Sequence, residues 1–181
     1  GGKDYLWGNA AYLLASVLAD SFAVRSWFDS ISGFDRGGLV RGLPTAKLIG
    51  QEGMVQSATD VVLVEAQAKE LAELGFIPLV FRAQTGDAAF YSTPTCGKAR
   101  QYVNAQATAS SRLMTHLHHL LAGSLIARYV KVIMREKSAS LRSAANREAF
   151  LNSWIQQFVV PEDLIGQPTE ASYPLLDAWI E

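Results

Sequence analysis

The sequence predicts an α+β fold in which a long central helix and flanking helices pack with a small mixed or antiparallel sheet. Three stretches of the 181 residues repeat apolar side chains at a helical period, namely residues 6–31, 105–136 and 146–159. Short apolar runs bounded by glycine and proline lie between the first two stretches and are typical of strands. An order of helix, short strands and then helices favours α+β architecture.

The first expected helix begins close to the start of the sequence. Its apolar positions run from Leu6 to Ile31, and Gly33 offers a plausible stop. The glycine-rich residues 33–44 that follow are expected to form a loop.

The middle of the chain is expected to supply the sheet. Residues 60–65 hold four consecutive aliphatic side chains, which predicts a short buried strand. Residues 66–74 predict a short helix that ends at Gly75.

A hairpin is expected after this helix. Residues 76–82 predict a second strand, which Pro78 confines to an edge of the sheet or to a strand start. Residues 84–87 have turn chemistry, so residues 88–92 are expected to return as the other arm.

The second half of the chain is predicted to be mainly helical. After an irregular stretch at 93–101, the period over 105–136 predicts one helix of about 45 Å, at about 1.5 Å per residue. A further helix is expected over 146–159, and Pro161 ends it.

Length and composition limit the class of protein. At about 150 residues per domain, the length predicts a single domain over residues 1–181. A hydrophobic content of 49% excludes intrinsic disorder, and no run of apolar residues is long enough to predict a membrane span. A formal charge of −1 argues against a general nucleic-acid binder, and the single cysteine, Cys96, fits a reducing cytoplasmic compartment.

Three histidines form the first candidate chemical site. His116, His118 and His119 are close in sequence, and two of them share a helix face. No acidic residue lies between Asp87 and Glu136 to complete a metal site or to orient a ligand. We therefore expect no metal.

A glycine loop and the cysteine are the other candidates. The loop from Gly37 to Gly42 lacks the Gly-Lys-Ser/Thr end of a phosphate-binding loop. Cys96 lacks the sequence context of a cysteine nucleophile. We expect no catalytic residue and no cofactor; the alternative is a cytoplasmic enzyme domain that uses the glycine loop with His116 or His119.

Charge is distributed unevenly along the chain. Residues 88–135 carry six cations and no acid, whereas residues 148–181 carry six acids and no cation. Arg128, Lys131 and Arg135 are spaced to form one stripe of a helix. Either the stripe is an ordinary solvated face, or it meets an acidic face on the next copy and is a subunit interface.

The sequence resembles a piece cut from a longer chain. A helical pattern begins almost at once, and at the other end Leu176, Ala178 and Ile180 alternate with polar residues up to the last position. This alternation is typical of a strand, and no partner strand is in view.

Six stretches stand out as motifs. They are residues 4–12, 37–45, 69–79, 127–135, 151–155 and 171–175, which read DYLWGNAAY, GGLVRGLPT, KELAELGFIPL, ARYVKVIMR, LNSWI and ASYPL. Together, and in this order, they resemble the C-terminal portion of the large sheath subunit of the bacterial type VI secretion system (VipB/TssC-like, EvpB family). The motifs span nearly the whole chain.

The resemblance implies a structural protein. In that family the large subunit pairs with a small sheath subunit, and the pairs polymerise helically around an inner tube. Sheath contraction propels the tube, and a separate hexameric ATPase recycles the contracted sheath. Strands are exchanged between neighbouring subunits, and the C-terminal strand of the family would correspond to residues 175–180. The resemblance therefore implies that Leu176, Ala178 and Ile180 are further candidates for a subunit interface. The expected partners are the small subunit, other copies, the inner tube protein and the ATPase, with no nucleic acid and no membrane span.

The chain departs from the family at both ends and in one internal stretch. Family members have a large region before the first motif and a strand-bearing tail after the position of Glu181. Residues 45–59 match the family poorly and are expected to form a variable loop. A phage-type contractile tail sheath protein is the second alternative.

Overall fold

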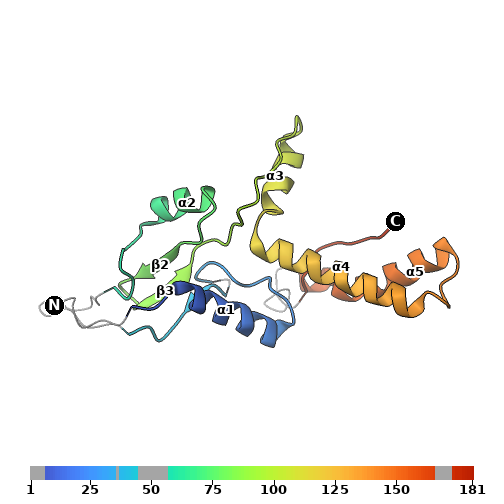
Figure 1. Ribbon diagram of the computed structural model, residues 1–181, viewed down its shortest axis with the longest axis horizontal. Helices are drawn as coiled ribbons and strands as arrows, with labels where there is room; N and C mark the ends of the chain where they lie inside the picture. Colours follow the sequence, from blue (N-terminus) through green and yellow to red (C-terminus); the bar gives the residue numbers. More distant parts are fainter. Residues whose placement is uncertain (1–6, 36, 45–56, 166–172) are drawn as a thin grey trace, which may run out of the picture. The chain divides into compact units, whose positions relative to one another are not determined.

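The computed structural model describes residues 7–35, 37–44, 57–165 and 173–181 (Figure 1). The variable loop predicted over 45–59 lies mostly outside these residues. Five α-helices and a three-stranded antiparallel sheet occur in the described part, which confirms the α+β prediction. The elements are α1 (Ala10–Arg25), β1 (Leu39–Val40), α2 (Glu65–Glu73), β2 (Leu79–Arg82), β3 (Asp87–Phe90), α3 (Ala105–Leu113), α4 (Leu117–Lys137), α5 (Ala144–Ile155) and the 3₁₀ turns η1 (Gln156–Phe158) and η2 (Glu162–Leu164).

The chain divides into two compact units. The first is Gly1–His118 and the second is His119–Glu181. The expectation of a single domain stays a prediction.

The sheet of the first unit is built on the hairpin of β2 and β3. The strand order is β1-β3-β2, and Leu79 lies opposite Phe90 in the hairpin. β2 is thus an edge strand, as Pro78 predicted. Gly86, with φ 74°, supplies the left-handed residue of the turn.

The hydrophobic core of the first unit involves α1, the segment after it, β1 and β3. Its buried side chains are Val17, Ile31, Val40 and Phe90. Ile31 is fully buried and Phe90 is 2% exposed. Burial of a side chain of this size stabilises the fold by about 1.5–3 kcal/mol.

α1 is shorter than the apolar period predicted. It begins after Asn9, whose side-chain oxygen accepts a first-turn N–H at 2.9 Å. It ends at Arg25 because Ser26 adopts a left-handed conformation, with φ 62°. Ile31 is buried from a non-helical segment, so the apolar pattern continues where the helix does not. The prediction of a helix running to Gly33 was wrong.

Two strand predictions in the first unit also need correction. Residues 60–65 form no strand, and Val61, Val62 and Val64 are 63%, 55% and 59% exposed. An apolar run becomes a strand only where the fold supplies a neighbouring strand. Conversely, β1 lies in the expected loop, and its two residues are too few to show a period. α2 confirms the predicted short helix, with Gly75 following at φ 91°.

The long helix predicted over 105–136 is two helices, α3 and α4. The residues between them pair with the irregular segment after β3. The Thr95 N–H donates to the Thr115 carbonyl at 2.9 Å, and the Leu117 N–H donates to the Thr93 carbonyl at 2.8 Å. These bonds occupy backbone groups that a continuous helix would use. The 21 residues of α4 span about 32 Å.

The second unit comprises α4 from His119 onward, α5 and the turns that follow. Ser143 caps α5, because its hydroxyl accepts a first-turn N–H at 3.1 Å. The rings of Tyr129 on α4 and Trp154 on α5 pack edge to face with their centroids 6.3 Å apart, and the rings of Trp154 and Phe158 do so at 5.1 Å. The helix predicted over 146–159 is confirmed as α5, and the 3₁₀ turn η1 takes the place of its last turn.

The last residues of the chain form no strand ladder. Leu175 makes a single parallel bridge to Val159, and the chain bends at Leu176 and Asp177. It then continues as a coil to the C-terminus (Figure 1). The strand predicted over 175–180 lacks a ladder because the described chain provides a helix, not a second strand, beside these residues.

Candidate functional site

The basic stripe consists of Arg128, Lys131 and Arg135 on α4. All three side chains are exposed, and none pairs with a carboxylate among the described residues. α4 has no fully buried residue in its 21 positions. The stripe therefore presents uncompensated positive charge on a helix that its own unit covers incompletely.

Apart from Glu136, which lies on α4 itself, the exposed acids among the described residues of this unit lie on other elements. Glu148 lies on α5, Glu162 on η2, and Asp177 and Glu181 lie near the C-terminus; all are exposed. A unit with opposite charges on different elements suits head-to-tail contacts between copies, which set register along a polymer.

The C-terminal segment, residues 173–181, is fastened to the second unit through its backbone. The Leu175 N–H donates to the Phe158 carbonyl at 3.3 Å, and the Leu175 carbonyl accepts the Val160 N–H at 2.9 Å. This bridge anchors the start of the segment just after η1.

Two amide side chains, Asn152 of α5 and Gln156 at the C-cap of α5, hold the rest of the segment, and we name them the amide clamp. Asn152 Nδ2 donates to the Ile180 carbonyl at 2.7 Å, and Asn152 Oδ1 accepts the Ile180 N–H at 2.8 Å. Gln156 Nε2 donates to the Ala178 carbonyl at 2.7 Å. Sequence analysis missed both amides. Their i, i+4 spacing, read together with an alternating apolar segment downstream, was the available signal.

The predicted interface residues of this segment differ in exposure. Leu176 is 71% exposed, whereas Ala178 and Ile180 are half-buried and have their backbone groups bound by the clamp. Trp179, between the two, is 69% exposed. In this segment Ala178 and Ile180 are bound by the clamp and partly covered, whereas Leu176 and Trp179 are exposed to solvent.

The glycine loop from Gly37 to Gly42 is a packed connection. The Gly38 N–H donates within the preceding turn at 3.1 Å, and its carbonyl accepts the Phe90 N–H at 2.9 Å. A Cβ on Gly38 would lie 2.6 Å from the backbone of Ser32. Close backbone packing explains this glycine without a phosphate ligand.

The histidines of the alternative site are not gathered around this loop. His116 lines a cavity of about 800 Å³ with Cys96 and Lys98. The glycine loop contributes to a different cavity of about 590 Å³. His119 belongs to the second unit. Within the first unit, the loop and His116 therefore face separate cavities.

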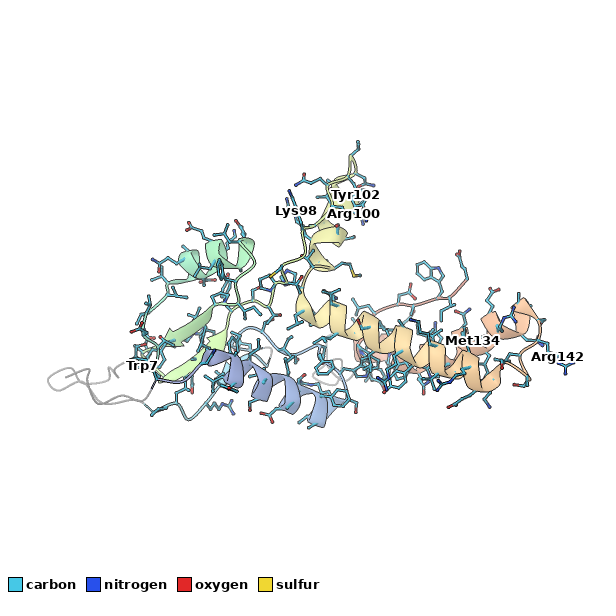
Figure 2. The ribbon with its side chains drawn as sticks, viewed as in Figure 1. Trp7, Lys98, Arg100, Tyr102, Met134 and Arg142 are labelled. Carbon is cyan, nitrogen blue, oxygen red and sulfur yellow. The ribbon has the colours of Figure 1, made fainter. Side chains whose placement is uncertain are left out.

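The larger cavity is lined by three cations, Lys69, Lys98 and Arg112, and by one acid, Glu73. Lys98 and Arg100 lie on the segment that leads into α3 (Figure 2). The Arg100 N–H donates to the Ser111 hydroxyl of α3 at 2.8 Å, which holds this segment along the helix.

Among the residues that the structure describes, no group of three or more His, Cys, Asp or Glu side chains could hold a metal ion. None of the helices in those ranges is long and apolar enough to cross a membrane.

Comparison with known proteins identifies the family. Residues 1–97 match the EvpB/VC_A0108 tail sheath N-terminal domain, and residues 106–181 match the EvpB/VC_A0108 tail sheath gpW/gp25-like domain. The type VI secretion system sheath protein TssC1 of Pseudomonas aeruginosa is 32% identical over 179 residues. That alignment covers 97% of this chain and 36% of the relative, so the chain spans little more than a third of the relative's length. The resemblance seen in the sequence motifs is confirmed, and the chain belongs to the EvpB/VipB family of type VI secretion tail sheath proteins.

Proposed function

We propose that this chain is a structural component of the type VI secretion sheath that pairs with a small sheath subunit and polymerises helically around an inner tube. The observation that carries the proposal is the C-terminal segment, which α5 holds by its backbone while Leu176 and Trp179 stay exposed. Strand addition between chains needs such a segment, because main-chain hydrogen bonds supply the affinity and side-chain alternation supplies the specificity.

Contraction would require the same subunits to pack in two ways. Polar and charged contacts can break and form again when rigid bodies slide. We assign this role to the basic stripe, Arg128, Lys131 and Arg135, facing acids on a neighbouring copy. Leu176, Ala178 and Ile180 would lie in the strand contact.

The proposal gives the chain no catalytic role and requires no cofactor. The energy for propulsion would come from many small differences in packing along the polymer. A separate hexameric ATPase would recycle the contracted sheath. We place the protein in the bacterial cytoplasm, beside its small partner and the inner tube.

The direct test is negative-stain electron microscopy of the full-length protein co-expressed with its small sheath partner. Hollow tubes with a helical surface lattice are expected, and the same preparation without the partner is the control. Discrete particles alone, in several buffers and with the partner present, would contradict the proposal. A ligand screen on the cavity beside His116 would then be the next step.

A further inference from the structure

The spacing of the two amide-clamp side chains along the helix matches the spacing of alternate residues along a strand. Asn152 of α5 and Gln156, the C-cap residue of this helix, are four residues apart, which separates them by about 6 Å along the helix axis. Ala178 and Ile180 are two residues apart, which is about 6.7 Å along an extended chain. Asn152 binds Ile180 and Gln156 binds Ala178, so the segment runs antiparallel to the helix.

The hydrogen bonds themselves require an extended backbone at Ile180. One side-chain amide reaches both the N–H and the carbonyl of this residue, at 2.8 and 2.7 Å. Both groups of one residue point to the same side only in a strand-like conformation, and this is the pairing that a neighbouring strand would make. Asn152 therefore stands in for one residue of a partner strand.

The orientation of the Asn152 amide is fixed by a third contact. Its Nδ2 also donates to the Glu148 carbonyl at 3.1 Å, one turn earlier in α5. Two carbonyl acceptors, from Glu148 and Ile180, require the nitrogen on that side and leave Oδ1 for the Ile180 N–H. An aspartate at this position would still accept the Ile180 N–H, but its second carboxylate oxygen would face the carbonyl oxygens of Glu148 and Ile180 and repel them.

The clamp leaves the other edge of the segment open. Successive residues of a strand direct their backbone groups to opposite edges, so the Trp179 N–H and carbonyl face away from α5. No described residue bonds to them. The acids at Asp177 and Glu181 flank this position and are exposed.

We propose that Asn152 and Gln156 are positioning residues that hold residues 178–180 as a preformed strand, whose open edge binds an extended basic segment of a neighbouring sheath subunit. This inference rests on the proposed sheath function and names the chemistry of the partner strand. Opposite charges facing each other across a strand pair are favourable, so cations belong opposite Asp177 and Glu181, with an apolar residue opposite Trp179.

The clamp is tested with a nearly isosteric double variant, Asn152→Asp with Gln156→Glu, in the full-length protein. The matched control is Asn146→Asp with Gln157→Glu, which adds the same charges to α5 and η1 but does not touch the segment. Hydrogen exchange of the peptide that contains residues 173–181 should become roughly tenfold faster in the clamp variant alone. The bonds to the Ile180 and Ala178 carbonyls are lost, and the new carboxylates repel these carbonyl groups, so the segment is released from the helix. Tube formation with the small partner should fall in the same variant.

The outcomes separate the inference from the function on which it rests. Unchanged exchange in the clamp variant overturns the clamp, and faster exchange with normal tubes overturns its role in presenting the edge. Absence of tubes from the unsubstituted protein contradicts the sheath proposal, and the exchange measurement still decides on the clamp.

The chemistry of the partner strand has its own test. Asp177→Lys with Glu181→Lys should reduce the fraction of protein in tubes at least severalfold, with exchange of the C-terminal peptide unchanged. Normal assembly of this variant would overturn the basic partner segment while leaving the clamp in place.

Discussion

The two units of the chain bury their side chains to different extents. In the first unit, α1, the segment after it, β1 and β3 enclose Phe90 and Ile31, which are 2% and 0% exposed. In the second unit, the fully buried apolar side chains of the described residues are Leu151, Ile155 and Val160, and α4 contributes none.

This difference indicates that the two units contribute differently to the stability of the chain and to assembly. A closed core stabilises a unit by itself, whereas a helix with no buried residue exposes apolar and charged surface that a partner can bury. The first unit is therefore expected to be the more rigid body, and the second is expected to gain stability on assembly.

Phe90→Ala should have the largest effect, because it empties the center of the first core. The free energy of unfolding of the first unit should fall by about 3–5 kcal/mol, measured by urea denaturation with hydrogen exchange of peptides from each unit. Phe76→Ala is the control, since Phe76 is 60% exposed, and it should change stability by about 0.5 kcal/mol or less.

The response of the second unit to Phe90→Ala also tests the single-domain prediction. Equal loss of protection in both units would mean that they unfold together. A small effect on the first unit itself would contradict the closed core.

Trp154→Ala should have the next largest effect and should act in the second unit. Trp154 joins Tyr129 of α4 to Phe158 after α5, and it is only half-buried. The expected loss is therefore about 2 kcal/mol, below the range for a fully buried aromatic residue. Protection of α4 peptides should fall, while peptides from the sheet should keep theirs. Equal losses in α4 and the sheet would show that this aromatic contact is not local to the second unit.

The two helix caps offer the same substitution in both units. Asn9→Ala in front of α1 and Ser143→Ala in front of α5 should each cost about 1 kcal/mol. Thermal unfolding measures the loss, and exchange in the first turn of each helix shows where it acts. If assembly stabilises the second unit, sheath formation should restore the stability of the Ser143 variant but not that of the Asn9 variant. Recovery of the Asn9 variant alone would contradict the expected difference between the two units.

The sequence predicted those parts of the fold that local chemistry determines. Turn residues such as Gly86 and Gly75 marked the hairpin and the end of α2, and Pro78 marked an edge strand. The motifs pointed to the family, because their order over the whole chain is more specific than any single stretch.

Tertiary hydrogen bonds decided what the sequence could not show. The residues between α3 and α4 fit a helical period, yet Thr93 and Thr95 bind their backbone groups from a distant loop. The amide clamp was missed for the same reason. Asn152 and Gln156 are ordinary polar residues of a helix until the chain brings Ile180 beside them.

Charge reversal in the basic stripe should have the smallest effect on stability and a large effect on assembly. In Arg128→Glu with Lys131→Glu, the free energy of unfolding should change by about 0.5 kcal/mol or less, because both side chains are exposed and unpaired within the described chain. The fraction of protein sedimenting as tubes should fall, and the loss should be larger at low salt, where charges act over a longer range.

The control is Lys137→Glu with Arg142→Glu, which makes the same charge change at the end of α4 and at the turn before α5 (Figure 2). If stripe and control variants assemble alike, the charge of the second unit matters only in sum, and the stripe is an ordinary solvated face. If the stripe variant alone fails while its fold is intact, the exposed face of α4 is the surface that a neighbouring subunit covers.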